Sequence, residues 1–347
     1  MASIVEKDEL LEVLPNFRCH LTREDGKSIK EFLNEELKKY VSELKQACEG
    51  CNSKLGKRNV ELIRGKISNI EENAGKIIKV FSLHENGKVF EATELAFSIF
   101  DDMRDYMPVG FDITKNRYFR IRSWENDPVN DREGLFHIPL SKRHLVKTER
   151  YSIPGHPCLY LATQAPLCWY ECGKPLKFSI ARFDVPQDVD DNFKLIDFQQ
   201  KLMPLKLAFI TWLDNANGEN EKDQIGDYLL KVLYTLPLRM ACSVDVLHPM
   251  ASFKEEYILP QLLTQWISKE DCFDGVKYES CKNDDEVHIQ GGYNVVFVTK
   301  QFDKDGYDIE LRKRISVGEP KNFELTTDEV NPWHIGIDDI PEEFQRI

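Results

Sequence analysis

The sequence lacks any long apolar segment. No stretch approaches the run of about eighteen apolar residues that a membrane-spanning helix needs, and the mean hydropathy is -0.45. The first residues, MASIVEKDELLEVL, carry acidic side chains where an export signal requires basic residues and then an apolar stretch. These features predict a cytoplasmic protein that makes no use of a membrane.

Positive charge is also scarce. The 347 residues include 46 Lys and Arg against 59 Asp and Glu, which gives a formal net charge of -13. Such a surface repels phosphate backbones, so broad binding of DNA or RNA is excluded from the expected functions. A small anion remains an acceptable ligand if several arginines are concentrated in one pocket.

The common catalytic motifs are absent as well. The sequence contains no GxGxxG, Walker loop, GxSxG or HExxH, which disfavours a Rossmann oxidoreductase and a P-loop kinase. Its nine cysteines are expected to be free thiols in a reducing compartment. We expect no metal, although Cys48 and Cys51 form half of a zinc site and leave that question open, with Cys19 and His20 as the nearest further ligands.

The length favours two domains. Residues 1–110 are predicted to form a mainly helical domain, because apolar residues recur at helical spacing over 29–44 and 91–103. Within it, residues 75–81 (GKIIKVF) predict a strand. The Pro108-Val109-Gly110 break marks the domain boundary.

Short strands mixed with helices then predict an α+β domain over residues 111–325, followed by an acidic tail over 326–347. The expected strands are 117–122, 158–162, 178–183, 197–198, 276–278 and 294–298, and the expected helices are 167–172, 224–242 and 253–268.

One group of residues has the side chains expected of a catalytic site. Arg150, Tyr160 and Glu171 follow one another at intervals of ten and eleven residues, on an expected loop, strand and short helix. An arginine pairs with a pyrophosphate, an aromatic ring stacks on nicotinamide, and a carboxylate stabilises an oxocarbenium-like cation. Together they suit the cleavage of an N-glycosidic bond in a dinucleotide.

The same residues carry a family resemblance. In order along the chain stand Tyr118-Phe119-Arg120, Arg150-Tyr151, Leu159-Tyr160-Leu161-Ala162, Glu171 and the segment 274–280 (DGVKYES). This series resembles the RES-domain family, named for an arginine, a glutamate and a serine, over about residues 115–315. The sequence departs from the family in having Ser152 where an asparagine is common, and in its long N-terminal extension.

The resemblance implies an ADP-ribosyltransferase-like mixed sheet and an enzyme that degrades NAD or transfers its ADP-ribose, often as a bacterial toxin. NAD would be the substrate. On that basis Arg120 and Arg150 would hold its phosphates, Tyr160 would pack on the nicotinamide side, Glu171 would be the catalytic acidic group, and Ser280 would bind the nicotinamide ribose or a phosphate.

Several alternatives stay open at this stage. Arg117 and Arg122 alternate with Arg120 along one strand, and any of the three could enter the pocket. Tyr160 is either a core residue or a contact of the ligand, and His137 is expected to be structural. The rival activities are mono-ADP-ribosyl transfer to a macromolecule and a non-enzymatic nucleotide-sensing module.

The helical extension is expected to bind a regulatory protein such as an antitoxin, and a homo-oligomer is left open. Its helical character also resembles HEPN domains. The Arg-x4-His signature of HEPN ribonucleases is missing from residues 1–110, which disfavours ribonuclease activity.

Overall fold

A computed structural model describes residues 9–13, 21–49, 53–109, 118–185, 193–199, 202–280, 292–326 and 344–346. It divides the chain into two compact units. The helical unit comprises residues 1–108 and 200–263, and the sheet unit comprises residues 109–199 and 264–347. The change of unit at Pro108 lies beside the boundary expected near residue 110. Residues 200–263, expected within the second domain, pack with the N-terminal helices instead, and no local pattern indicated this.

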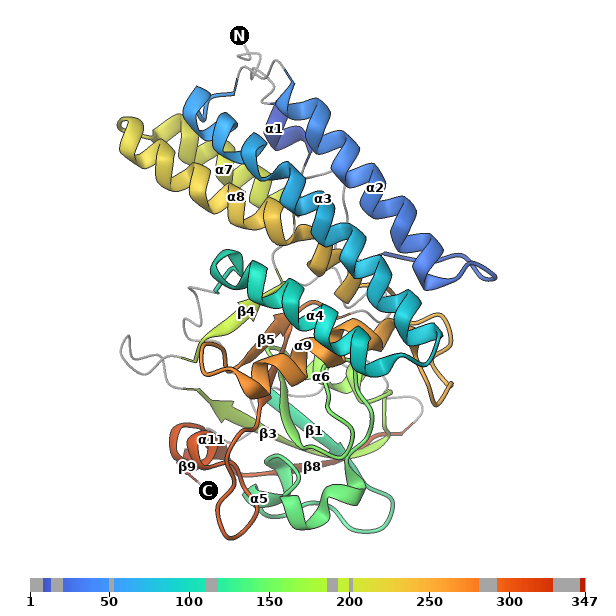
Figure 1. Cartoon of the computed structure of the whole chain (residues 1–347). Coiled ribbons are helices and arrows are strands. Elements are labelled where there is room, and N and C mark those ends of the chain that lie inside the picture. Colours follow the sequence, from blue (N-terminus) through green and yellow to red (C-terminus); the bar gives the residue numbers. More distant parts are fainter. Residues whose placement is uncertain are drawn as a thin grey trace. The chain divides into compact units, whose positions relative to one another are not determined.

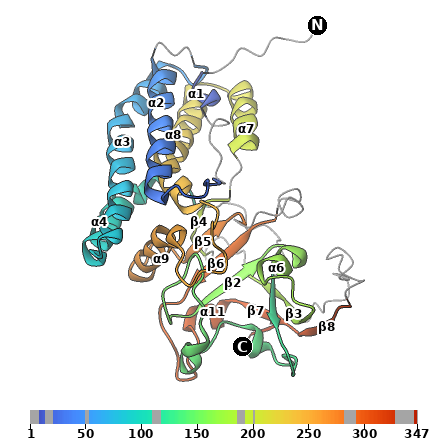
Figure 2. The same cartoon turned by 90° about the vertical axis from the view of Figure 1, so that its right-hand side faces the viewer.

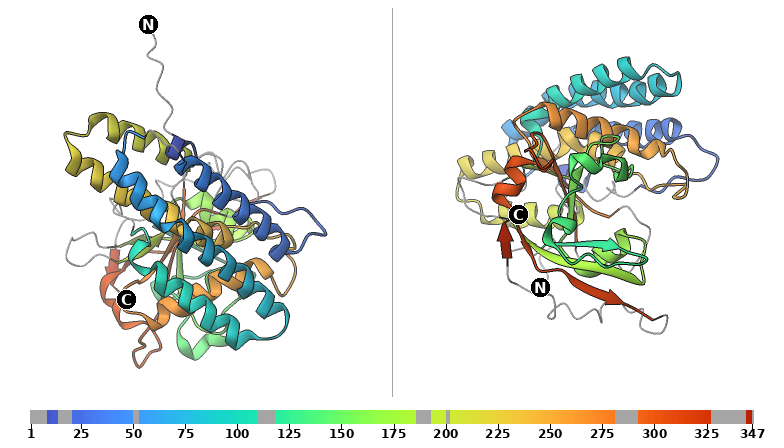
Figure 3. Two further views of the ribbon diagram at one scale, coloured as in Figure 1. Left: turned by 45° about the horizontal axis from the view of Figure 1, so that its top comes forward. Right: turned by 90° about the horizontal axis from the view of Figure 1, so that it is seen from below.

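The helical unit is built on long helices that lie side by side (Figures 1 and 2). α2 (Ile29–Cys48) packs on α3 (Lys57–Glu85), and α3 packs on both α4 (Val89–Met103) and α8 (Glu219–Cys242). The left panel of Figure 3 shows α2, α3 and α8 running alongside one another. The shorter elements are α1 (Glu9–Glu12), η2 (Arg104–Tyr106), α7 (Leu202–Asn215) and η4 (Glu255–Tyr257).

The start of α2 shows why the sequence forms a helix there. Ser28 accepts a hydrogen bond from the backbone N–H of Glu31, and the Glu31 carboxylate accepts one from the backbone N–H of Ser28. This reciprocal pair satisfies two N–H groups that a helix otherwise leaves without partners. The helix predicted over 29–44 is confirmed, as is the one predicted over 91–103.

The strand predicted over residues 75–81 is wrong. These residues belong to α3, where Ile70, Ala74, Ile77 and Phe81 are buried in steps of three or four residues. A seven-residue window shows only the β-branched composition typical of a strand, because the helical period becomes visible only over a longer stretch of α3. Packing against neighbouring helices then outweighs the weak strand preference of isoleucine and valine.

The sheet unit contains a nine-stranded mixed sheet in the described part of the chain. Its strands are β1 (Tyr118–Ser123), β2 (Cys158–Ala162), β3 (Lys177–Asp184), β4 (Leu195–Asp197), β5 (Gly275–Tyr278), β6 (Asn294–Val298), β7 (Ser316–Gly318), β8 (Lys321–Glu324) and β9 (Phe344–Arg346). The associated helices are α5 (Arg132–Leu135), η3 (Leu140–Leu145), α6 (Ala165–Glu171) and α11 (Ile309–Arg314). α9 (Ile258–Lys269) begins in the helical unit and ends in the sheet unit.

The strand order is β4-β5-β6-β2-β1-β3-β7-β9, and β8 pairs with β3 as well. Only β4 and β5 are parallel among these pairs, so the α+β class predicted from the sequence is confirmed. The strands predicted over 117–122, 158–162, 178–183, 276–278 and 294–298 are all present, and the strand expected at 197–198 lies at 195–197. α7 was not predicted.

The sheet has two faces, and the site depends on which face each side chain occupies. The core face carries Tyr118, Leu159 and Ala181, which belong to one buried apolar cluster. The opposite face, here called the α6 face, carries Phe119, Ala162 and Ile180 and packs against α6. Because side chains alternate along a strand, the pairing register assigns every strand residue to one of these two faces.

No helix in the described residues is long and apolar enough to cross a membrane.

Candidate active site

Tyr160 lies on β2 between two core residues. Leu159 and Leu161 point into the core cluster, so Tyr160 leaves the strand on the α6 face. Its hydroxyl donates a hydrogen bond of 2.6 Å to the backbone oxygen of Tyr151. Burial raises the pKa of Tyr160 well above its ordinary value, so the hydroxyl stays protonated. Tyr160 as a whole residue is only partly buried.

Glu171 is the last residue of α6, and a buried amide holds its carboxylate. Asn294, which is 5% exposed, donates a hydrogen bond of 2.7 Å from Nδ2 to Glu171 Oε1. Asn294 stands at the start of β6 and pairs with Ala162 on one side and Tyr278 on the other. The register therefore places the Asn294 side chain on the α6 face, next to those of Tyr160 and Tyr278.

Arg150 and Ser280 are tied to this face through their neighbours. Arg150 is buried in the turn just before Tyr151, and the ring of Tyr151 packs on that of Tyr278 with centroids 4.7 Å apart. Ser280 follows Tyr278 by two residues and is also buried. Both residues thus stand next in sequence, or nearly so, to aromatic side chains of the same cluster.

Arg120 is placed differently. It pairs with Ala181 of β3, so it leaves β1 on the core face, opposite Tyr160. Its Nη1 atom is buried without a hydrogen-bond partner in the described residues. Burial, reinforced by the charge of Arg122, lowers the pKa of Arg120 to about 10, and Cys168, Cys172 and Tyr160 oppose this shift. Hence the five predicted residues do not all leave the sheet on one side, although Arg120 and Tyr160 are within electrostatic range.

The sequence missed three residues of this cluster. Asn294 is the most informative of them, because it is a buried polar residue at the head of an apolar strand, NVVFV. Such a residue requires a partner, and the signal was present in the sequence. Tyr151 and Tyr278 were noted only as parts of a family pattern, and their stacking could not be predicted because it joins a turn to a distant strand.

His137 has a structural position in the sheet unit. Its side chain is fully buried, with Nε2 accepting a hydrogen bond from the backbone N–H of Asp308 and Nδ1 lying 2.9 Å from the Ile138 oxygen. Since the first nitrogen accepts, the second carries the proton and donates. Burial lowers the pKa of His137 to about 4 from the ordinary value of 6.5. The ring is thus held neutral.

This depressed pKa predicts a pH dependence of stability. Below pH 6.5 His137 becomes protonated in the unfolded chain, whereas in the folded protein it stays neutral down to about pH 4. The free energy of unfolding therefore falls as the pH drops through this window. Between pH 7 and pH 5 the wild type should lose about 2 kcal/mol more than His137→Gln, which keeps one acceptor and one donor but does not titrate. Urea denaturation of both proteins at the two pH values measures this difference. Equal losses would show that His137 does not control the acid sensitivity.

The structure describes only part of the possible zinc site at Cys48 and Cys51. No group of three or more His, Cys, Asp and Glu side chains within the described ranges is arranged to hold a metal ion. Cys48 is buried at the end of α2, whereas Cys51, Cys19 and His20 lie outside the described residues. A zinc site at Cys48 and Cys51 therefore stays a hypothesis.

Comparison with known proteins gives one informative similarity. The chain is similar to a protein of Bacillus subtilis (strain 168) named "Putative toxin YopC", with 27% identity over 311 residues that cover 80% of this chain and 62% of the relative. The chain thus spans about three fifths of that relative's length. No family model matches the sequence. No solved structure matches it either.

Proposed function

We propose that this protein is an NAD-consuming enzyme of the RES type that cleaves the nicotinamide N-glycosidic bond and acts as a toxin. The observation that carries the proposal is the Glu171 carboxylate, fixed by Asn294 on the sheet face that also bears Tyr160 and Tyr278. A positioned carboxylate beside aromatic rings suits a reaction in which a positively charged sugar develops.

The reaction assigns a distinct task to each part of the cluster. When the bond between nicotinamide and the ribose breaks, its electron pair goes to nicotinamide and positive charge develops on the ribose. Glu171 stabilises that charge, and the ring of Tyr160 packs against the leaving ring. Arg150 binds the pyrophosphate, and Ser280 donates a hydrogen bond to the ribose or a phosphate.

Arg120 leaves β1 on the core face, opposite Tyr160, so this scheme gives it no direct contact with NAD. Its Nη1 is a buried donor without a hydrogen-bond partner in the described residues, which is costly unless a ligand provides an acceptor. Even with its pKa lowered to about 10, the guanidinium stays charged at neutral pH.

The toxin role is supported by the similarity to the Bacillus subtilis relative. An enzyme that destroys NAD without control deprives a cell of its main redox carrier, so growth arrest follows from the proposed reaction. A regulatory partner that binds the helical unit would keep such an activity in check.

Mass spectrometry of the products tests the proposal. We expect the purified full chain, incubated with NAD, to release nicotinamide together with ADP-ribose in water, or ADP-ribose 1″-phosphate when phosphate is the nucleophile. Transfer of label from NAD to a protein or nucleic acid would favour the ADP-ribosyltransferase alternative instead. If NAD stays intact under all conditions, the core is a binding module and the proposal is wrong.

A further inference from the structure

A cavity of about 540 Å3 lies in the sheet unit beside the end of β1. Arg122 and Ser123 of β1, residues of α5, and residues of the η3 segment line it. Arg122 pairs with Ser179 and leaves β1 on the core face, opposite the face that carries Tyr160 and Asn294. The cavity is therefore separate from the candidate active site, and its volume is in the range of small-molecule sites.

Three cationic side chains line this cavity, namely Arg122, Lys142 and Lys147. None of them forms an ion pair in the part of the chain that the structure describes, and Arg122 makes one hydrogen bond, of 2.6 Å from Nη1 to the Gly134 oxygen. Lys142 and Lys147 are exposed. The three cations outnumber the two carboxylates of the same lining, Asp131 and Glu133, so in a chain with a net charge of -13 the cavity is a locally positive site that attracts an anion.

The rest of the lining suits a ring and its polar substituents. Tyr307 presents an aromatic ring, which Phe136 and the Arg312 guanidinium hold at centroid distances of 6.0 and 5.3 Å. Pro139 and the half-exposed Leu145 add apolar surface. The carboxylates of Asp131 and Glu133 lie at the same cavity, where they can accept hydrogen bonds from ribose hydroxyls or an amino group.

We propose that this cavity binds a phosphate ester of mononucleotide size. The phosphate contacts Arg122, Lys142 and Lys147, and the base packs against Tyr307 and the neighbouring apolar residues. A fork-shaped guanidinium is well suited to a phosphate, and the two lysines add charge without demanding fixed geometry. The inference does not rest on the proposed NAD cleavage, because the ligand needs no nicotinamide and its site is on the other face of the sheet.

Isothermal titration calorimetry of the full chain with AMP tests this site. AMP should bind, while adenosine and inorganic phosphate should each bind at least about tenfold more weakly, because each supplies only half of the contacts. Arg122→Gln should weaken AMP binding about tenfold or more, and affinity should fall as the salt concentration rises.

Charge-reversal variants at exposed lysines test the AMP site without disturbing the folded core. Lys142→Glu and Lys147→Glu change exposed side chains, and each should weaken AMP binding at least about tenfold, whereas Lys313→Glu on α11, outside the cavity, should not change it. Absence of AMP binding at about 1 mM, or equal affinity in wild type, Lys142→Glu and Lys147→Glu, would overturn the proposal.

Discussion

Glu171→Gln should reduce the rate of NAD cleavage by about 1,000-fold or more, which is the typical loss when a positioned group that stabilises transition-state charge is removed. The amide keeps the size of the side chain and can still pair with Asn294, whose donated bond of 2.7 Å holds the carboxylate. The negative charge alone disappears. Since that charge acts on the developing sugar cation and not on bound NAD, kcat should fall much more than KM changes.

Asp184→Asn is the matched control for this measurement. Asp184 is an exposed carboxylate at the last position of β3 and has no assigned role in the reaction, so its loss should change the rate of NAD cleavage by less than about twofold. Nicotinamide release, followed by chromatography, measures all three proteins. A Glu171→Gln variant as active as Asp184→Asn would contradict the catalytic role of Glu171 even if the protein consumes NAD.

Asn294→Ala provides a second readout on the same site. Asn294 acts through Glu171, so its loss should lower kcat by about 10- to 100-fold and leave residual activity above that of Glu171→Gln. Asn294→Asp would place a second carboxylate beside Glu171 and raise the pKa of the pair, which shifts the pH–rate profile to higher pH. A purely structural asparagine would change activity without moving that profile.

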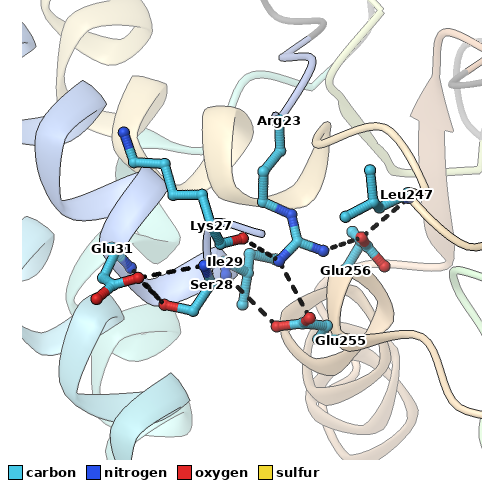
Figure 4. Close-up of polar contacts among 8 residues, drawn as sticks. All are labelled: Arg23, Lys27, Ser28, Ile29, Glu31, Leu247, Glu255 and Glu256. Atoms are coloured by element: carbon cyan, nitrogen blue, oxygen red, sulfur yellow. Dashed lines mark hydrogen bonds and ion pairs between the residues drawn. The ribbon is translucent and has the colours of Figure 1, made fainter. Parts of the chain in front are cut away.

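Arg23→Met should destabilise the helical unit by about 3–5 kcal/mol, because it leaves a buried carboxylate without its cation. Figure 4 shows Arg23 between two acidic residues, with Nη1 3.1 Å from Glu255 Oε1 and Nη2 2.8 Å from Glu256 Oε1. The side chains of Arg23 and Glu256 are each 2% exposed. After the substitution, Glu256 would keep the backbone N–H of Leu247 as its donor, at 3.1 Å.

Lys45→Met is the control for the buried pair. Lys45 pairs with Glu71 at 2.7 Å, but both side chains are about half exposed, so the loss should be at most about 1 kcal/mol. Urea denaturation followed by far-ultraviolet circular dichroism gives both free energies of unfolding. The double variant Arg23→Met/Glu256→Leu should recover part of the loss. Equal effects of Arg23→Met and Lys45→Met would mean that burial adds nothing to this ion pair.

Local sequence patterns predicted most of the elements that carry the site. β1, β2, β3, β6 and α6 lie within two residues of their expected bounds. Each of them combines a regular apolar pattern with a clear end signal, such as the Gly-x-Pro before β2 or Pro166 in the first turn of α6. α3 shows the limit of this approach, since seven residues of a long helix can have the composition of a strand.

Tertiary structure decided the relations between elements that lie far apart in the chain. The spacing of Arg150, Tyr160 and Glu171 indicated which residues to consider, but it did not identify Asn294, which reaches Glu171 only because β6 pairs with β2. It also left open which of Arg117, Arg120 and Arg122 enters the pocket, with Arg120 favoured by the family pattern. The register of β1 with β3 places Arg120 and Arg122 on the core face, and the cavity beside β1 is lined by Arg122.

The sequence by itself determined the α+β composition, the strands and helix that bear the candidate residues, and the acidic surface, because these follow from residue type and short-range periodicity. Only the tertiary structure decided which side of the sheet each side chain occupies and that residues 200–263 pack with the N-terminal helices. Strand pairing and helix packing join segments more than a hundred residues apart, and their free energy depends on shape complementarity that no local pattern encodes.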